Sequence, residues 1–560
     1  MRTMNYQRYE SYPAVDLPDR RWPLARISQA PRWCSVDLRD GNQALHIPMD
    51  VEKKMRLFEL LVQTGFKEIE VGFPSAAEVE FQFVRRLIEE QRIPEDVTIQ
   101  VLVQAREHLI RRTFEALRGV HKAIVHLYNS TSPVQREVVF GMDKKQVCDL
   151  AVKGARMVKS LAAAFPAGAI RFEYSPESFT GTELDYALDV VCAVMDVWQP
   201  HPQEPMIINL PATVEMSTPN IYADRIEWFV RHMPQRQSVI LSIHTHNDRG
   251  TAVAAAELAV MAGAQRVEGA LFGNGERSGN MDIVVMAMNL FSQGVDPQLD
   301  FSDMDKVMAV YTQCTGMEVH PRHPYAGSLV YTAFSGSHQD AIYKSMNSPR
   351  CSSARRWAVP YLPIDPHDVG RTYEAIIRIN SQSGKGGAAY ILEHDYGIPM
   401  PKWMKADFGR AVQALAERTG AEVTAAQLYD LFRQEYVARE QPWSLRQCHI
   451  DSENSIFERQ FGPTAHVRAV LSDEGHQVGF SESGNGPVDA FVKGFKKISG
   501  IAFSLQEYAE YAIDQGEDAR AAAYVLLEIA EKGQIIGVGI DSNIAIASMK
   551  AVIAAVNRAK

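Results

Sequence analysis

The sequence predicts an α/β protein in which residues 31–305 form a (β/α)8 TIM barrel. Residues 1–30 are expected to be an N-terminal extension, 306–435 mostly helical linker subdomains, and 436–560 a C-terminal α+β domain with an internal repeat. Three observations predict this organisation. Eight short apolar runs alternate with helical patterns, polar residues gather where those runs end, and two stretches near the C-terminus share one strand–turn–helix pattern.

Composition excludes several classes of protein. A chain of 560 residues is too long for one ordinary core, so several domains are expected. The net charge of −10, without a basic run, argues against a nucleic-acid partner. No apolar stretch approaches the roughly 20 residues that span a membrane, and the start MRTMNYQRYESYP has no apolar secretory segment. Six scattered cysteines form no C-x-x-C pair, so we expect a cytoplasmic protein with reduced thiols.

The eight apolar runs are short and rich in β-branched residues, as buried parallel strands are. They are WCSVDLRD (33–40), KEIEVGFP (67–74), VTIQVLVQ (97–104), KAIVHLYN (122–129), AIRFEYSPE (169–177), PMIINLPAT (205–213), SVILSIHTHND (238–248) and RVEGALFGNGE (266–276). Stretches such as 51–65 and 251–264 read as helices, each with a glycine near its C-terminus. An open, doubly wound sheet is the alternative, but no G-x-G-x-x-G follows the first strand.

Chemistry in a barrel lies at the carboxyl ends of the strands, and two histidines lie at the end of the seventh. His244 and His246 are two residues apart, so on a strand their rings point to one face. They are either a half-site for a metal ion or a hydrogen-bonded pair in the core. With Asp40 at the end of the first strand they would make a three-ligand site with open positions, which is typical of a catalytic ion. Asn280 is a weaker fourth candidate, and Zn²⁺, Mn²⁺, Co²⁺ and Mg²⁺ all remain candidates.

Five motifs carry a resemblance to a known family. They are DLRDGNQAL (37–45), SPES (175–178), LPATVE (210–215), HTHNDRGTAVA (244–254) and GNGERSGN (273–280). Together they resemble the Claisen-condensing acyl-CoA synthases, a group that includes the 2-isopropylmalate, homocitrate and citramalate synthases. SQSGKGGAAY (381–390), DVGRTYEA (368–375) and the long C-terminal region are similar to the long form of the 2-isopropylmalate synthase family.

This resemblance implies a reaction of acetyl-CoA with 2-oxoisovalerate and water that gives 2-isopropylmalate and CoA. The ion held by Asp40, His244 and His246 would chelate the keto acid and activate its ketone. Arg39 would stabilise the alkoxide, or alternatively only neutralise Asp40 or Glu177. Thr213 would donate its hydroxyl to the keto acid's carboxylate, or alternatively bond only to the backbone.

The resemblance also implies how the methyl group of acetyl-CoA loses its proton. Glu177, on the fifth strand, and His338, beyond the barrel, are implied to be the proton-transfer groups. His338 would reach over the rim from outside the barrel, either from the same chain or from a second subunit. His126 on the fourth strand is a candidate for the substrate pocket. Tyr373 resembles a residue that lies beside the family's site and is tied to regulation.

The implied partners and cofactors follow from the same resemblance. A divalent ion (Mg²⁺, Mn²⁺ or Zn²⁺) is expected, with activation by a monovalent cation, and the chain is expected to form a homodimer. Homocitrate or citramalate synthase remains the alternative within the family, since a one-methyl change in the pocket is worth only about 1–3 kcal/mol. A non-catalytic, amino-acid-binding barrel is the alternative outside it.

The C-terminal region contains the predicted repeat. HQVGFSESGNGPVDAFVKGFKKI (476–498) and QIIGVGIDSNIAIASMKAVIAAV (534–556) each read as a strand, a glycine-bearing turn and an apolar-faced helix. Free N–H groups at such turns suit a small carboxylate. The resemblance implies a leucine-sensing regulatory domain, with leucine at the turns around Gly484, Gly486, Gly537 and Gly539. The alternative is a dimerisation domain without a ligand.

Overall fold

The computed structural model describes most of the chain. The residues that it describes are 12–333, 335–352, 356–372, 385–419, 423–437, 439–452, 465–513 and 519–560. The chain divides into two compact units, one of Met1–Tyr331 with Ile364–Thr372 and one of Thr332–Pro363 with Tyr373–Lys560. Within the described ranges, no helix has both the length and the apolar character needed to cross a membrane.

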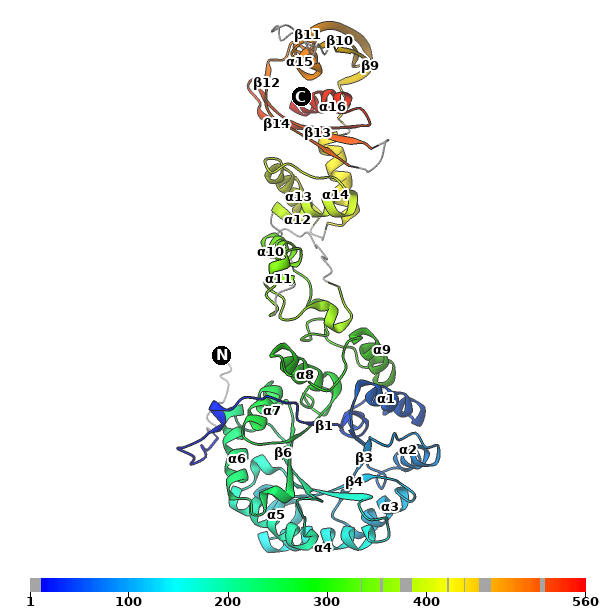
Figure 1. The fold of residues 1–560 in the computed structure, drawn as a ribbon, viewed down its shortest axis with the longest axis vertical. Coiled ribbons are helices and arrows are strands. Elements are labelled where there is room, and N and C mark those ends of the chain that lie inside the picture. Colours follow the sequence, from blue (N-terminus) through cyan, green and yellow to red (C-terminus); the bar gives the residue numbers. More distant parts are fainter. Residues whose placement is uncertain are drawn as a thin grey trace, which may run out of the picture. The chain divides into compact units, whose positions relative to one another are not determined.

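The first unit contains the closed parallel barrel that the sequence predicts, with its strands paired in chain order and β1 closing against β8. The strands are β1 (Arg32–Ser35), β2 (Glu68–Gly72), β3 (Thr98–Gln104), β4 (Ala123–Ser130), β5 (Ile170–Glu177), β6 (Met206–Ala212), β7 (Val239–Thr245) and β8 (Arg266–Gly269). The helices are α1 (Val51–Thr64), α2 (Glu78–Glu89), α3 (Glu107–Ala116), α4 (Lys144–Ala162), α5 (Leu184–Trp198), α6 (Pro219–His232), α7 (Ala252–Met261) and α8 (Ile283–Ser292). Figure 1 shows the helices outside the ring of strands.

Local signals set the ends of the predicted helices. At α1, the Asp50 side chain accepts a hydrogen bond from the backbone N–H of Lys53 and caps the first turn. Gly65 ends the helix at φ +109°, a left-handed conformation that favours glycine. Gly263 has φ +113° two residues after α7. The predicted ranges 51–65 and 251–264 are therefore confirmed to within a few residues.

Several strands are shorter than their apolar runs, among them β1, β7 and β8, which ends at Gly269. The run 33–40 was expected to be strand throughout, but β1 ends at Ser35 and Asp37–Gly41 winds into a π-helical turn. The backbone N–H of Gly41 donates back to the carbonyl oxygen of Val36, which turns the chain across the mouth of the barrel. β7 likewise ends at Thr245, so His246 lies one residue beyond the strand.

The inside of the barrel contains a buried polar network. Arg266 of β8 is fully buried and forms ion pairs with Glu68, Glu173 and Glu268 on three strands. Its guanidinium also donates to the side-chain oxygen of Gln100 at 2.7 Å. This network lies inside the barrel below the rim on which the candidate ligands lie.

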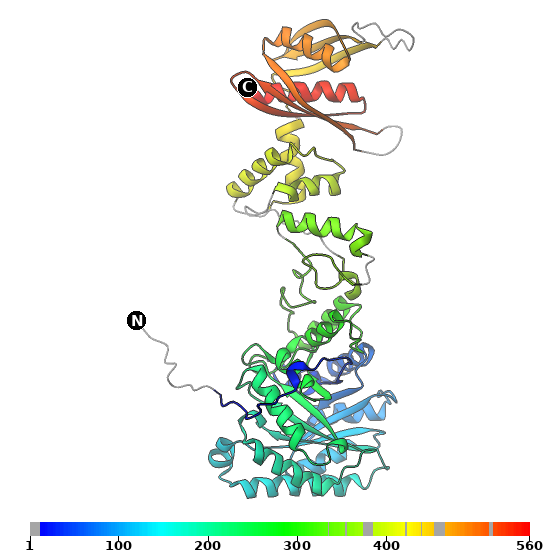
Figure 2. The same cartoon turned by 60° about the vertical axis from the view of Figure 1, so that its left-hand side comes forward.

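The second unit consists of helices followed by two related modules. Its helices are α10 (Gly336–Met346), α11 (Pro349–Ser352), α12 (Lys385–Tyr396), α13 (Lys405–Thr419) and α14 (Ala425–Phe432), while α9 (Met304–Thr315) belongs to the first unit. The modules are β9 (Trp443–Ser452), β10 (Ala465–Asp473), β11 (His476–Gly484) and α15 (Pro487–Ser499), then β12 (Phe503–Ala512), β13 (Ala521–Ile529), β14 (Gly533–Asp541) and α16 (Ile544–Ala559). Figure 2 shows both modules in orange and red.

Each repeat is larger than the sequence suggested. The predicted strand–turn–helix units correspond to β11–α15 and β14–α16, but two further antiparallel strands precede each of them. Gly537 and Gly539 lie within β14 and not in a turn, which corrects the sequence expectation. A Cβ at either position would lie about 2 Å from a backbone carbonyl oxygen of α16 (Ala551 or Ala547). These glycines therefore let α16 pack directly against the sheet.

Candidate active site

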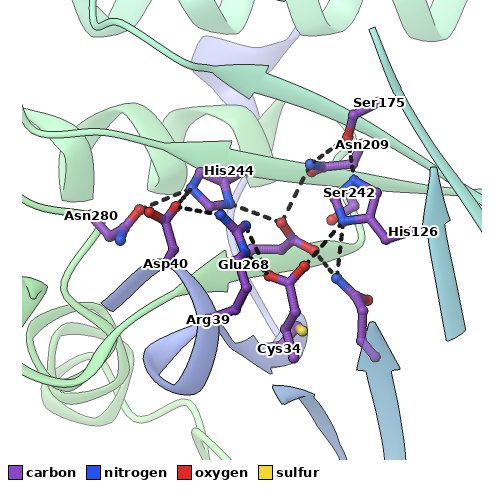
Figure 3. Close-up of polar contacts among 12 residues, drawn as sticks. Cys34, Arg39, Asp40, His126, Ser175, Asn209, Ser242, His244, Glu268 and Asn280 are labelled. Atoms are coloured by element: carbon purple, nitrogen blue, oxygen red, sulfur yellow. Dashed lines mark hydrogen bonds and ion pairs between the residues drawn. The ribbon is translucent and has the colours of Figure 1, made fainter. Parts of the chain in front are cut away.

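Asp40, His244 and His246 meet at the carboxyl end of the barrel, although β1 and β7 are not neighbours. The Oδ2 atom of Asp40 lies 3.1 Å from Nε2 of His244 and 3.6 Å from Nε2 of His246. All three side chains are buried, and the three candidate ligand atoms lie within 4.8 Å of one another. The π-helical turn after β1 brings Asp40 to the imidazole of His244 (Figure 3). Two nitrogens and one carboxylate oxygen are a donor set that fits a divalent metal ion.

Glu268 of β8 fixes the orientation of His244. Its Oε2 atom lies 2.9 Å from Nδ1 of His244, so the opposite ring nitrogen, Nε2, faces Asp40. Nε2 also lies 2.9 Å from Oδ1 of Asn280, whose own Nδ2 donates to the carbonyl oxygen of Asn274. A carboxylate behind a ligand histidine is a common device for selecting its tautomer. Sequence reasoning missed Glu268, whose only signal was an acidic residue within an apolar strand.

The cluster carries an excess of negative charge. Five carboxyl groups, those of Asp40, Glu68, Glu70, Glu173 and Glu268, form ion pairs with the half-buried Arg39 and the buried Arg266. Burial raises the pKa of Asp40, but the charge of Arg39 and the hydrogen bonds from the two imidazoles outweigh it and hold that pKa well below its usual range. Such a site favours a cation.

The same carboxyl groups change the pKa of His244. Burial disfavours its charged form, but hydrogen bonds to Asp40 and Glu268 raise its pKa to about 9. Burial also raises the pKa of Glu173 well above its ordinary value, more than Arg266 lowers it. In the absence of a metal ion, therefore, protons on His244 and Glu173 offset part of the negative charge.

Arg39 lies beside the candidate ligands and faces a cavity. Its guanidinium lies 3.3 Å from Asp40 and 2.9 Å from Glu70, and these two ion pairs hold it at the rim. The cavity has a volume of about 850 Å³. Its wall includes seven of the predicted site residues of the barrel: Arg39, Asp40, His126, Glu177, Thr213, His244 and His246.

The predicted substrate residues have defined partners. Glu177, the last residue of β5, accepts a hydrogen bond from the Ser130 hydroxyl. The Thr213 hydroxyl oxygen accepts the backbone N–H of Ser178 at 2.9 Å, which leaves its own proton free to donate. His126 is buried, with Nε2 at 2.7 Å from the Ser175 hydroxyl.

The other predicted residues belong to the second unit. His338 lies on α10 of the second unit and stacks on Tyr361, with ring centroids 4.0 Å apart. Gly484 ends β11, and Gly486 is the N-cap of α15. Tyr373 lies outside the described residues. The roles of these residues stay predictions.

The fold and the cluster at its rim define a barrel enzyme with a candidate metal site. A family model described as HMGL-like matches residues 30–310. Models for an alpha-isopropylmalate synthase post-catalytic domain and for the LeuA allosteric (dimerisation) domain match residues 328–393 and 422–560. The chain belongs to the 2-isopropylmalate synthase family.

Curated relatives support this assignment over the whole chain. A 2-isopropylmalate synthase of Clostridium acetobutylicum is 54% identical and covers 100% of both chains. Those of Rhodospirillum rubrum and a Parafrankia species are 53% and 54% identical, over 98% and 99% of this chain and 98% of each relative. The predicted family is confirmed, and homocitrate synthase, citramalate synthase and a non-catalytic barrel are not favoured.

Proposed function

We propose that this chain condenses acetyl-CoA with 2-oxoisovalerate and water, giving 2-isopropylmalate and CoA, in the first committed step of leucine biosynthesis. One observation carries the proposal. Asp40, His244 and His246 converge beside Arg39 on a cavity that Glu177 also lines. A cation site, an oxyanion-stabilising cation and a carboxylate base are the groups that such a condensation needs.

The keto acid would bind at the cation cluster. Asp40, His244 and His246 would hold a divalent ion (Mg²⁺, Mn²⁺ or Zn²⁺), which when bound polarises the ketone and neutralises the adjacent carboxylate. Thr213 would donate its free hydroxyl proton to that carboxylate, since its oxygen already accepts a backbone N–H. Arg39, held by Asp40 and Glu70, would stabilise the negative charge that grows on the ketone oxygen.

The acyl donor requires a base. Glu177 would take a proton from the methyl group of acetyl-CoA, and the Ser130 hydroxyl holds its carboxylate in place. The methyl carbon then bonds to the ketone carbon, and the ketone oxygen takes up a proton. Water cleaves the thioester, which releases CoA and leaves a carboxylate on the product. His126 would contact substrate from β4, and His338 would act as a second proton-transfer group.

The second unit would regulate the reaction. The match to an allosteric (dimerisation) domain supports leucine as the effector and a homodimer as the assembly. We propose that leucine binds near Gly484 and Gly486 and that Tyr373 contributes to regulation. Activation by a monovalent cation belongs to the same proposal. All six cysteines are free, which accords with a cytoplasmic location.

The testing experiment follows CoA release from acetyl-CoA against a panel of 2-oxo acids with Mn²⁺ or Mg²⁺ present. We expect the highest kcat/KM with 2-oxoisovalerate. A higher value with 2-oxoglutarate or pyruvate would identify a homocitrate or citramalate synthase. CoA release with none of the acids would favour a non-catalytic barrel.

A further inference from the structure

We infer that Arg225 and Tyr12 are positioning residues for Glu177, and that they connect the N-terminal segment to the catalytic rim. The inference rests on the proposed function, in which Glu177 removes a proton. Arg225 lies on α6 and is buried. Its Nη2 atom donates to the carbonyl oxygens of Phe179 and Thr182, both at 2.7 Å. These two carbonyls belong to the turn that directly follows Glu177.

The turn fixes the backbone of Glu177. Ser178 adopts φ +60°, a left-handed conformation that is costly for a residue other than glycine, and its N–H is held by Thr213. The carbonyl oxygen of Glu177 accepts the N–H of Thr131 at 3.1 Å. Arg225 therefore holds a strained turn that begins at Ser178, the residue directly after the proposed base. If these hydrogen bonds are lost, the turn can relax and move the carboxylate of Glu177.

Burying the positive charge of Arg225 at this place costs free energy. Among the residues that the structure describes, no carboxylate forms an ion pair with it, and its Nε atom has no hydrogen-bond partner. Burial lowers its pKa, and its charge is offset by carbonyl dipoles, by the Tyr12 hydroxyl and by the Phe179 ring, 4.8 Å away. Nη2 of Arg225 donates to the two carbonyls while Nη1 donates to the Tyr12 hydroxyl, so one planar guanidinium holds three acceptors in a fixed geometry. This geometry accounts for a buried cation without a counter-ion.

Tyr12 connects Arg225 and this turn to the N-terminal segment, residues 12–30. Its hydroxyl accepts a hydrogen bond from Nη1 of Arg225 at 3.1 Å and donates to the carbonyl oxygen of Thr180. The phenol thereby holds the middle of the turn whose two ends Arg225 holds.

The N-terminal segment is itself fastened to α6. Asp224 accepts hydrogen bonds from Nε of Arg20 and from the indole N–H of Trp22, both at 2.8 Å. Glu227 accepts the backbone N–H of Trp22 at 2.9 Å. In Figure 1 this segment, in dark blue, lies beside α6 and α7. The same stretch of α6 therefore binds the segment and the turn.

The test compares full-length variants in the presence of Mn²⁺. Arg225→Met and Tyr12→Phe should lower kcat about 10–100-fold and about 3–10-fold, while the dissociation constant of 2-oxoisovalerate changes less than about threefold. Arg225→Lys should recover part of the loss. Arg236→Met is the matched control, because Arg236 also donates to two carbonyls, those of Val239 and Gly263, but at the amino end of β7. It should lower the thermal unfolding midpoint without a comparable loss of kcat.

Double variants separate this inference from the proposed function. If Arg225 acts through Glu177, adding Arg225→Met to Glu177→Gln should cost less than about threefold more in kcat. A full further loss, or an equal loss of kcat in Arg236→Met, would overturn the positioning role while Glu177 remains the base. Normal turnover in Glu177→Gln alone would instead refute the proposed base, and the inference would fall with it. If Arg225→Met does not fold, Tyr12→Phe and Arg225→Lys decide the question by the same comparison.

Discussion

Replacing Glu268 with glutamine should weaken metal binding although Glu268 is not itself a ligand. Its Oε2 atom lies 2.9 Å from Nδ1 of His244, and Oε1 accepts from Arg266 at 2.8 Å and from Gln100 at 3.0 Å. A carboxylate can accept on both sides, but a glutamine has one acceptor oxygen and one donor nitrogen. The fully buried charge of Arg266 favours the orientation in which the oxygen faces the guanidinium.

That orientation places an N–H group against Nδ1 of His244. The ring must then carry its proton on Nε2, the nitrogen that faces Asp40, and this nitrogen can no longer ligate an ion. We expect metal affinity to fall about 10–100-fold, or about 1.4–2.7 kcal/mol. Titration calorimetry of Mn²⁺ into chelator-treated protein measures this change directly.

Glu173→Gln provides the matched control. Glu173 lies in the same buried network, 3.5 Å from Arg266, and its raised pKa makes it a neutral acid that glutamine mimics. Its metal affinity should stay within about threefold of that of the unchanged protein. Wild-type affinity in Glu268→Gln, or an equal loss in both variants, would refute the tautomer argument.

Four further outcomes are expected. Chelation should abolish CoA release and added Mn²⁺, Mg²⁺ or Zn²⁺ should restore it, whereas full activity after exhaustive metal removal would defeat the site assignment. Metal affinity should rise about tenfold per pH unit up to about pH 9, because His244, whose pKa is raised to about 9, must lose its proton before it can bind the ion. A metal affinity that does not change with pH below 9 would contradict this. Glu177→Gln should lower kcat about 10²–10⁴-fold with little change in keto-acid binding, and equal losses in both would indicate a binding role. Gly486→Asp should place a carboxylate at the start of α15, where no atom lies within 4 Å of a new Cβ. The leucine concentration for half-inhibition should then rise. An unchanged concentration would mean that leucine binds elsewhere.

The barrel and its three candidate ligands could be predicted from the sequence, because the patterns that indicate them involve residues close together in the chain. Apolar runs and helix caps predicted the eight strand–helix units, and the spacing of His244 and His246 predicted that their rings share one side. The assignment of Asp40 needed only the rule that strand ends meet at one rim. The end of β1 was misjudged, because backbone bonds of the turn around Gly41 override an apolar run that reads as strand.

Sequence alone determined the order of strands and helices, the family and the set of chemical groups at the rim, since these follow from periodicity and from motifs of neighbouring residues. Only the tertiary structure decided which buried carboxylate orients His244 and which residues hold the turn after Glu177. Glu268 and His244 are 24 residues apart, and Arg225 and Tyr12 are 213 apart. The first pair comes together when β8 pairs with β7, where His244 and Glu268 are in register, and the second when the N-terminal segment packs on α6. In that low-dielectric interior each hydrogen bond is stronger than it would be in water.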